Sequence, residues 1–281
     1  MSTAALNTRA ALLVTAAMAA FCVNDAVIKS LSVRVPIGEL MAVRGLMAIL
    51  LMLAVLPWLG LRVGPAERFT WLRAAGEVGV TFAFLAALTR LPLGETYTLY
   101  FVGPILLTAG AALVFGETVG PRRWLAVIVG FLGVLVVLGL PSSWQMASGL
   151  ALGAALLSAI RDLATRRIPA NVGSGTVAIV TGVAVALSGA LTVVDGSWVA
   201  LGGTDLGLCA LAALGVAGGY TAFVMGLRLG ELSFIATLRY SGIPIAMLLG
   251  LVGWGEMPGQ RMLAGAALIV ASGLFIVWRG R

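Results

Sequence analysis

Ten apolar stretches follow one another through the chain, and each is long enough to cross a bilayer as an α-helix. Of the 281 residues, 60% are hydrophobic and only 10% are charged, whereas about 25% are charged in a soluble domain. The sequence therefore predicts an all-α integral membrane protein. The stretches lie at about residues 10–30, 36–59, 71–90, 92–115, 122–140, 147–166, 173–194, 206–227, 230–254 and 260–278.

The placement of basic residues predicts the orientation, because cytoplasmic loops are enriched in lysine and arginine. With the N-terminus in the cytoplasm, the inner side carries Arg9, Arg62, Arg68, Arg73, Arg122, Arg123, Arg166, Arg167, Arg228, Arg279 and Arg281. The outer side then carries only Lys29, Arg34, Arg90 and Arg261. We predict a multi-pass protein of the inner (plasma) membrane, with an uncleaved first span and both termini in the cytoplasm.

Sequence landmarks recur at offsets between 136 and 140 residues. The recurring features are Leu93-Gly94-Glu95 with Leu229-Gly230-Glu231, Pro104 with Pro244, Gly116-Glu117 with Gly255-Glu256, Asp25 and Lys29 with Asp162 and Arg166, and Gly45 with Gly182. This order predicts two five-helix repeats, residues 1–141 and 142–281. Because five is odd, the second repeat enters the membrane from the opposite side, so the repeats are expected to be inverted.

A family resemblance rests on the same landmarks. In each half a proline is followed about a dozen residues later by Gly-Glu and then by a final span rich in small residues. This pattern resembles the EamA-type module of the drug/metabolite transporter superfamily, present twice and covering nearly the whole chain. The resemblance implies ten helices around a central cavity, an alternating-access mechanism, and amino acids, other metabolites or drugs as substrates.

Several other classes of activity are disfavoured by the composition. The chain has no histidine and no G-x-x-x-x-G-K-[ST] phosphate loop, and Cys22 and Cys209 lie in apolar segments without metal-ligand spacing. We expect no catalytic residues, no metal, no cofactor and no ATP-driven pumping by this chain alone. The net charge of +7 is ascribed to arginines that flank the spans rather than to nucleic-acid binding.

An arginine, Arg239, lies in the middle of the apolar segment Leu229–Gly255. A charged side chain at the centre of a bilayer costs roughly 2.5–3.5 kcal/mol, so Arg239 is expected to face protein or an aqueous cavity. Pro244 follows five residues later and predicts a kink beside the arginine, and Pro104 is the equivalent helix breaker in the first half.

Polar and aromatic residues near these prolines are candidates for a substrate pocket. Tyr100 aligns with Tyr240 at the offset of 140 residues, and Arg239 has the fork of donors that binds a carboxylate or a phosphate. Tyr97 on the fourth stretch and Asn24 on the first complete the predicted pocket. The alternative for the tyrosines is an interfacial aromatic belt.

Charged residues near the ends of the spans suggest two gates at opposite mouths of one pathway. The predicted outer gate consists of Asp25, Lys29 and Glu95, and its equivalent at the inner mouth consists of Asp162, Arg166 and Glu231. Asp25 and Lys29 are four residues apart and share one helical face, so we predict that they form a charge pair. The alternative is that these are interfacial charges that reach water and cap helix ends.

Three further intramembrane charges, Glu39, Arg44 and Arg161, are each expected to find an interhelical partner or to contact substrate. Arg161 is expected to face away from the adjacent Asp162, and Glu77 to pair with Arg73 on the preceding turn.

Small residues recur at four-residue spacing in the third stretch, at Ala75, Gly79, Ala83 and Ala87, and again at Gly215 and Gly219. Tight helix packing is the first interpretation of this ladder and lining of a cavity is the second.

Taken together, these features predict a secondary transporter that exports small organic solutes, with amino acids and related metabolites as the leading candidates. The alternative is uptake of a larger anionic metabolite, such as an S-adenosyl compound, a flavin or a nucleotide sugar, or drug efflux. Protons are one candidate coupling ion and facilitated diffusion is the other possibility. The double repeat predicts that a monomer holds the whole pathway, which disfavours a scaffold subunit, and an integral-membrane enzyme is disfavoured too.

Overall fold

The computed structural model describes residues 3–58, 60, 63–115, 120–139, 145–169, 171–194, 196–229 and 238–278, and the regular structure within these ranges is helical. In chain order the elements are α1 (Thr3–Leu31), α2 (Ile37–Val55), α3 (Arg68–Leu88), α4 (Leu93–Tyr100), α5 (Gly103–Phe115), α6 (Pro121–Leu138), α7 (Met146–Thr165), α8 (Ser174–Leu191), α9 (Gly203–Leu229), the 3-10 helix η2 (Arg239–Ser241), α11 (Gly242–Trp254) and α12 (Gln260–Trp278).

Membrane-length helices account for most of the fold. Seven helical segments in the described ranges are long and apolar enough to cross a bilayer, one of them formed by α4 and α5 together at Leu93–Val114. Two shorter apolar helices, Trp124–Leu138 and Gln260–Phe275, lie within α6 and α12. These helices confirm the prediction of an all-helical membrane protein, whereas the count of ten spans stays a prediction.

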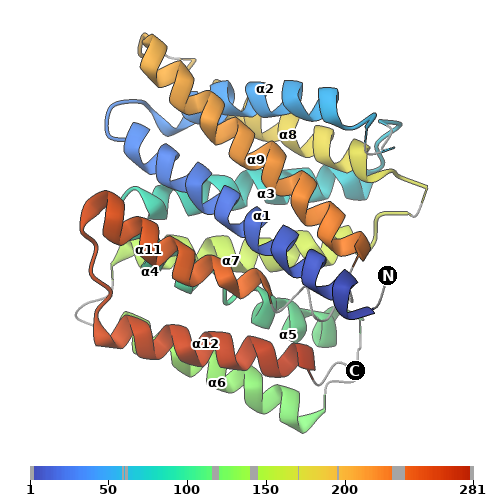
Figure 1. Ribbon diagram of the computed structural model, residues 1–281, viewed down its shortest axis with the longest axis vertical. Helices are drawn as coiled ribbons and strands as arrows, with labels where there is room; N and C mark the ends of the chain where they lie inside the picture. The colour runs from blue at the N-terminus through green and yellow to red at the C-terminus, as the bar shows by residue number, and fades with distance from the viewer. Residues whose placement is uncertain are drawn as a thin grey trace.

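The helices lie side by side across the molecule (Figure 1). One edge is formed by α2 and α8 and the other by α6 and α12, and both of these pairs are in contact. Between the edges, α1 packs along α9, α3 along α7, and α4 against α11. Because α1 begins and α12 ends on the same side of the bundle, we call this side the termini end and the other side the opposite end.

Glycines allow the backbones of the two edge pairs to touch. A Cβ atom added at Gly38 on α2 would lie 2.6 Å from the carbonyl oxygen of Gly189 on α8, and one at Gly189 would lie 2.5 Å from that of Gly38. At the other edge, a Cβ on Gly265 of α12 would lie 2.6 Å from the carbonyl oxygen of Gly133 of α6. Close approach of this kind is how helices associate in lipid.

The small-residue ladder also packs against neighbouring helices. A Cβ on Gly79 of α3 would lie 3.2 Å from the Leu157 side chain on α7, and a Cβ on Gly215 of α9 would lie 2.7 Å from the Ala20 carbonyl oxygen on α1. At these two positions the structure supports the packing interpretation.

Two helical segments change their course or helix type near the middle of the bundle, the membrane-length segment Leu93–Val114 and the shorter segment of η2 and α11. One break separates α4 from α5 at Phe101–Val102, and the other is the change from η2 to α11, which begins at Gly242. Pro104 and Pro244 fall in the first turns of α5 and α11, where a missing N–H loses no helical hydrogen bond. The change of helix type at Arg239–Ser241 lies beside the arginine, where the kink was predicted, while the kink itself stays a prediction.

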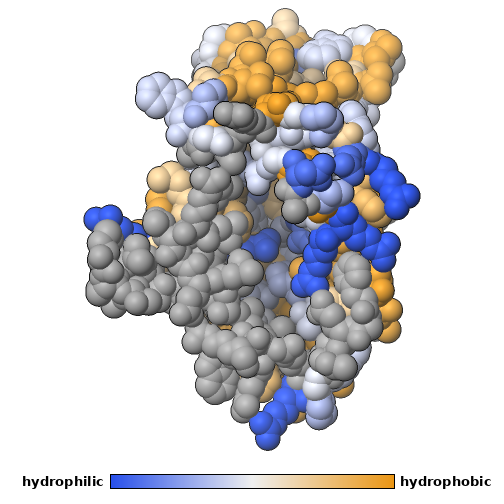
Figure 2. All heavy atoms as spheres, turned by 90° about the vertical axis from the view of Figure 1, so that its right-hand side faces the viewer, coloured by the Kyte–Doolittle hydropathy of each residue, from blue (hydrophilic) through white to orange (hydrophobic). Residues whose placement is uncertain are grey.

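Large apolar side chains cover the outward faces of the bundle. Exposed fractions reach 80% for Leu113 on α5, 62% for Leu125 on α6 and 59% for Leu248 on α11. At the termini end, by contrast, hydrophilic residues gather and some lie recessed in a hollow in the middle of the face (Figure 2). Apolar flanks and a polar hollow fit a bundle whose sides contact lipid and whose interior contacts water.

Candidate functional site

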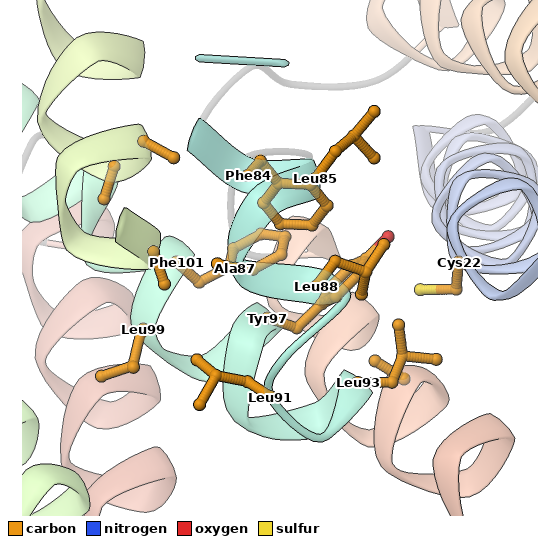
Figure 3. Close-up of a cluster of buried hydrophobic side chains, with 14 of the residues drawn as sticks. Cys22, Phe84, Leu85, Ala87, Leu88, Leu91, Leu93, Tyr97, Leu99 and Phe101 are labelled. Atoms are coloured by element: carbon orange, nitrogen blue, oxygen red, sulfur yellow. The ribbon is translucent and has the colours of Figure 1, made fainter. Parts of the chain in front are cut away.

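Five aromatic rings meet where α4 breaks from α5. We call them the aromatic cluster: Phe84, Tyr97, Tyr100, Phe101 and Tyr240. Ring centroids are 5.0 Å apart for Phe84 and Tyr100, and 5.8 Å apart for Phe101 and Tyr240. Tyr97 and Phe101 are stacked at 5.9 Å. Figure 3 shows the Tyr97 hydroxyl directed toward α1, on the side of Cys22. The two tyrosines aligned by the repeat, Tyr100 and Tyr240, thus both contact Phe101.

Tyr240 and Arg239 occupy η2, at the break before α11. The Tyr240 side chain is buried, and its hydroxyl, which packs against Gly273 of α12, has no hydrogen-bond partner among the described residues. The half-buried guanidinium of Arg239 lies 5.9 Å from the ring centroid of Phe223 on α9. Arg239 is also within electrostatic range of Tyr100. A buried donor without a partner and a cation therefore border the aromatic cluster.

A first polar network, the Asp25 network, joins α1, α2 and α4 in the half of the bundle nearer the opposite end. Arg44 Nη1 donates to Asn24 Oδ1 at 3.0 Å, and Asn24 Nδ2 donates to Asp25 Oδ1 at 2.7 Å. The Tyr97 hydroxyl donates to Asp25 Oδ2 at 2.5 Å. Arg44 Nε is buried and has no partner among the described residues. Arg44 thus finds an interhelical partner, as the cost of burial requires.

A second polar network, the Arg161 network, joins α3 and α7 nearer the termini end. Arg161 Nη1 donates to Glu77 Oε2 at 2.7 Å, and Arg161 Nε donates to Asp162 Oδ1 at 2.9 Å. The prediction that Arg161 faces away from Asp162 is wrong, because the long side chain folds back to bridge both carboxylates. Glu77 also approaches Arg73, at 4.0 Å, but its closer partner is on α7.

The predicted outer gate differs from the one in the structure. Lys29 does not pair with Asp25, because Lys29 Nζ contacts Glu256 Oε1 at 2.5 Å and the Leu91 carbonyl oxygen at 2.7 Å. Glu95 lies close by in a pocket of about 220 Å³ that Glu256 and Arg261 also line. The pairing by sequence distance is therefore wrong, although Lys29 does form a partly buried ion pair at the opposite end.

The predicted inner gate is only partly within the described residues. Asp162 accepts hydrogen bonds from Arg161, and Arg166 is exposed at the C-terminal end of α7. Glu231 lies outside the described residues, as does Glu117 of the repeated Gly-Glu pair. The role of these residues as a gate stays a prediction.

Glu39 belongs to neither polar network, and its hydrogen-bond partner is a backbone N–H group. It is buried in the first turn of α2, and its Oε2 accepts a hydrogen bond from the Val199 N–H at 2.9 Å. The bond ties the segment before α9 to the start of α2, where a carboxylate also interacts favourably with the helix dipole.

We expect Glu39→Leu to lower the melting temperature, because it removes the carboxylate that accepts from the Val199 N–H, and a hydrogen bond to a charged group contributes about 1.5–3 kcal/mol. Glu39→Gln keeps an acceptor oxygen, so both stability and transport should stay close to wild type. Thermal unfolding in detergent and a liposome transport assay check this pair of variants. Loss of transport in stable Glu39→Gln would instead indicate that this carboxyl carries a coupling proton.

Sequence reasoning missed three participants in these sites. Phe84 and Phe101 are members of the aromatic cluster, but a phenylalanine in an apolar span gives no signal that separates it from a lipid-facing residue. Glu256 was found only as part of a repeated Gly-Glu pair. The repeated Gly-Glu pair was the available signal for Glu256. It did not indicate the contact with Lys29, which lies 227 residues away in sequence.

No group of three or more potential metal ligands occurs in the part of the chain that the structure describes.

Comparisons with known proteins bear on these sites. Residues 8–139 match the model of the EamA-like transporter family. The chain is 26% identical to a riboflavin transporter of Vibrio cholerae serotype O1, covering 92% of this chain and 89% of the relative. It is 28% identical to a riboflavin transporter of Rhizobium johnstonii, covering 69% and 65%. It is 27% identical to the pseudopaline exporter of Pseudomonas aeruginosa, covering 90% of each chain.

The fold also has a counterpart among solved structures. One crystal structure superposes with a TM-score of 0.66 at 20% identity, covering 95% of this chain and 96% of the other. Helical membrane architecture, buried polar networks and these relatives together define a membrane transporter rather than an enzyme. More narrowly, residues 8–139 match the EamA-like transporter family, and the similar proteins are named transporters of the drug/metabolite transporter superfamily, which confirms the resemblance.

Proposed function

We propose that this protein carries a flavin-like metabolite, a planar heteroaromatic ring with a polar tail, across the inner membrane by alternating access. The observation that carries the proposal is the aromatic cluster, which lies at the break between α4 and α5 and contacts the Asp25 network through Tyr97. Three relatives named riboflavin transporters support the same class of substrate.

The aromatic cluster suits a flat ring in both shape and chemistry. Aromatic pairs contribute about 0.5–1.5 kcal/mol beyond the burial of their area. The hydroxyl of Tyr240 is a buried donor without a partner, and an acceptor on a ring or tail would satisfy it. The mixture of apolar walls and a few polar groups is typical of small-molecule sites.

Many secondary transporters achieve alternating access with two inverted halves, and the packing supports an inverted repeat of residues 1–141 and 142–281 around a central cavity. Exchanging α1 with α7, α2 with α8, α3 with α9 and α6 with α12 turns the α1–α9 contact into the α7–α3 contact. In the α2–α8 and α6–α12 pairs the same exchange swaps the two helices with each other, so both contacts are preserved. We therefore propose ten spans, including α6, η2 with α11, and α12.

For the orientation, we propose that the termini end is cytoplasmic. The bias of arginines toward that side supports this placement. The Lys29 contacts then belong to the outer mouth, and Asp162 and Arg166 to the inner one.

A second candidate substrate class is carboxylate-bearing solutes, which includes the amino acids favoured by sequence reasoning. The observation in its favour is the buried Arg44 Nε donor, which has no partner among the described residues. Arg239 adds a second guanidinium beside the aromatic cluster. The relative named a pseudopaline exporter shows that export also occurs among the similar proteins.

Counterflow into liposomes separates the two candidates. Purified protein is reconstituted with unlabelled solute inside, and uptake of labelled riboflavin is compared with uptake of a labelled amino-acid panel. We expect saturable riboflavin counterflow that survives in Arg239→Ala. Amino-acid counterflow that is lost in Arg239→Ala, with no riboflavin signal, would contradict the flavin proposal and favour the second candidate.

A further inference from the structure

The opposite end of the bundle is held shut by a compact set of contacts around Lys29. Lys29 Nζ lies 2.5 Å from Glu256 Oε1, and Glu256 Oε2 accepts a hydrogen bond from the Leu93 N–H at 2.7 Å. Lys29 Nζ also donates to the Leu91 carbonyl oxygen and lies 5.2 Å from the Trp254 ring centroid. We call the Lys29–Glu256 pair, with the Leu91 and Leu93 backbone groups, the latch. It connects α1, the start of α4 and the segment after α11.

Burial distinguishes this ion pair from an ordinary surface pair. The side chains of Lys29 and Glu256 are only 11% and 17% exposed, and the pair has backbone partners on both sides. Arg34 and Asp205 form another ion pair at the same end, but Arg34 is 57% exposed. Exposed pairs contribute little to stability, so the latch is the stronger of the two connections.

The helix α4 links the latch to the aromatic cluster. It has eight residues, a length of roughly 12 Å at 1.5 Å per residue. Its first residue, Leu93, donates to the latch, and Tyr97, one turn later, donates to Asp25. Its last residue, Tyr100, and the adjoining Phe101 belong to the aromatic cluster. One short, rigid element therefore spans from the latch to the candidate substrate site.

Helix α1 is connected to α4 in two ways from one face, directly through Asp25 and Tyr97, and indirectly through Lys29, which contacts Leu91 just before α4 and the Glu256 that accepts from Leu93. Asp25 and Lys29 are four residues apart, so both point from the same side of α1. Asp25 holds Tyr97, and Lys29 holds the Leu91 carbonyl oxygen and Glu256. A movement of α4 away from α1 must strain both contacts together.

The aromatic cluster is filled by its own side chains when the latch is closed. The centroids of Phe101 and Tyr240 are 5.8 Å apart, and those of Tyr97 and Phe101 are 5.9 Å apart. A ring inserted between two others needs about 7 Å, which is two van der Waals contacts of about 3.5 Å. A stacked ligand must therefore part these rings, and it binds the parted arrangement better than the closed one.

We infer that α4 is a lever that couples occupancy of the aromatic cluster to release of the latch. A planar ligand that parts Phe101 from its neighbours displaces the end of α4. The displacement withdraws Tyr97 from Asp25 and the Leu93 N–H from Glu256, and the opposite end opens. The inference rests on the proposed function in one respect, namely that the substrate occupies the aromatic cluster.

Spin-label distances across the latch test the lever in the full chain. Val33, in the turn between α1 and α2, and Met257, after α11, are 87% and 81% exposed, so Val33→Cys/Met257→Cys accepts two labels. Cys22 and Cys209 are buried and stay unlabelled. Double electron–electron resonance is measured in nanodiscs with and without saturating riboflavin, and riboflavin fluorescence quenching reports binding in the same sample.

We expect one short distance without ligand and a second, longer population with riboflavin. Glu256→Gln and the nearly isosteric Tyr97→Phe should each increase the longer population without ligand, because each removes one of the contacts that hold α4 closed. Asp205→Asn, which breaks the exposed ion pair, is the matched control and should leave the distribution unchanged.

The outcomes separate the lever from the proposed function. Riboflavin quenching without any change of distance overturns the lever alone. A Tyr97→Phe distribution identical to that of the parent protein also overturns it, since α4 would then not hold the latch. Absence of riboflavin binding overturns the proposed function and removes the basis of the lever.

Discussion

Replacing Arg161 with alanine is expected to abolish stable folding or to lower the melting temperature more than any other single change in the two polar networks. Arg161 donates to Glu77 and to Asp162 and bridges α3 and α7. Its removal leaves two carboxylates in the bundle without their closest cation. Breaking a buried ion pair from one side costs about 3–5 kcal/mol. Size-exclusion chromatography of detergent-solubilised protein after heating measures the effect.

A charge-neutral variant distinguishes an unpaired charge from a lost contact. Arg161→Met combined with Glu77→Leu and Asp162→Asn removes all three charges, and we expect it to be markedly more stable than Arg161→Ala. Arg90→Ala, at an exposed site just after α3 where the side chain donates to the Ala86 carbonyl oxygen, should change stability by less than about 0.5 kcal/mol. Equal instability of the alanine and the charge-neutral variants would contradict this explanation.

Replacing Gly189 with valine should separate α2 from α8 and prevent normal folding. A Cβ at this position would lie 2.5 Å from the Gly38 carbonyl oxygen and 2.6 Å from the Met41 Cβ. The Gly38 carbonyl oxygen is a backbone atom, so it cannot move aside by a change of side-chain rotamer. Overpacking of this kind costs about 1–3 kcal/mol or more. We expect a lower melting temperature and a smaller yield of monodisperse protein.

Gly153 provides the matched control for Gly189. It lies in the interior of α7, and a Cβ there would meet nothing within 4 Å. Gly153→Val therefore makes the same change of side chain and of intrinsic helix preference without a steric conflict. If both variants were equally unstable, the loss would come from valine in a helix rather than from the contact between α2 and α8.

Much of the architecture follows from the sequence, because membrane-length apolar runs and glycine spacing are local signals. The predicted stretch at 36–59 corresponds to α2, Ile37–Val55, and the stretch at 147–166 to α7, Met146–Thr165. In a bilayer, an apolar run of this length satisfies its backbone polar groups only as a helix. The run alone therefore determines the element and nearly its bounds.

The partners of the charged residues were harder to predict, because they are decided by packing between distant segments. Lys29 lies four residues from Asp25, and the local rule pairs them. In the folded chain Glu256 and the Leu91 carbonyl oxygen lie closer to Lys29, while Asp25 is already held by Asn24 and Tyr97. The local rule failed because both residues had better partners elsewhere.

The repeat provided information that local patterns did not. The offset of 140 residues aligned Tyr100 with Tyr240, and the structure brings both to Phe101. The substrate role of these tyrosines, of Asn24 and of Arg239 remains a prediction.

Riboflavin binding to purified protein tests the central claim most directly. Flavin fluorescence falls when the ring stacks on an aromatic side chain, so titration of the protein into riboflavin should quench the signal saturably. Phe101→Leu, which replaces the central ring by an aliphatic side chain, should weaken binding about tenfold, equivalent to about 1.4 kcal/mol. Phe131→Leu, at an exposed position on α6, is the matched control and should bind as the parent protein does. Saturable quenching that is unchanged in Phe101→Leu would contradict the account, because the ring would then bind outside the aromatic cluster.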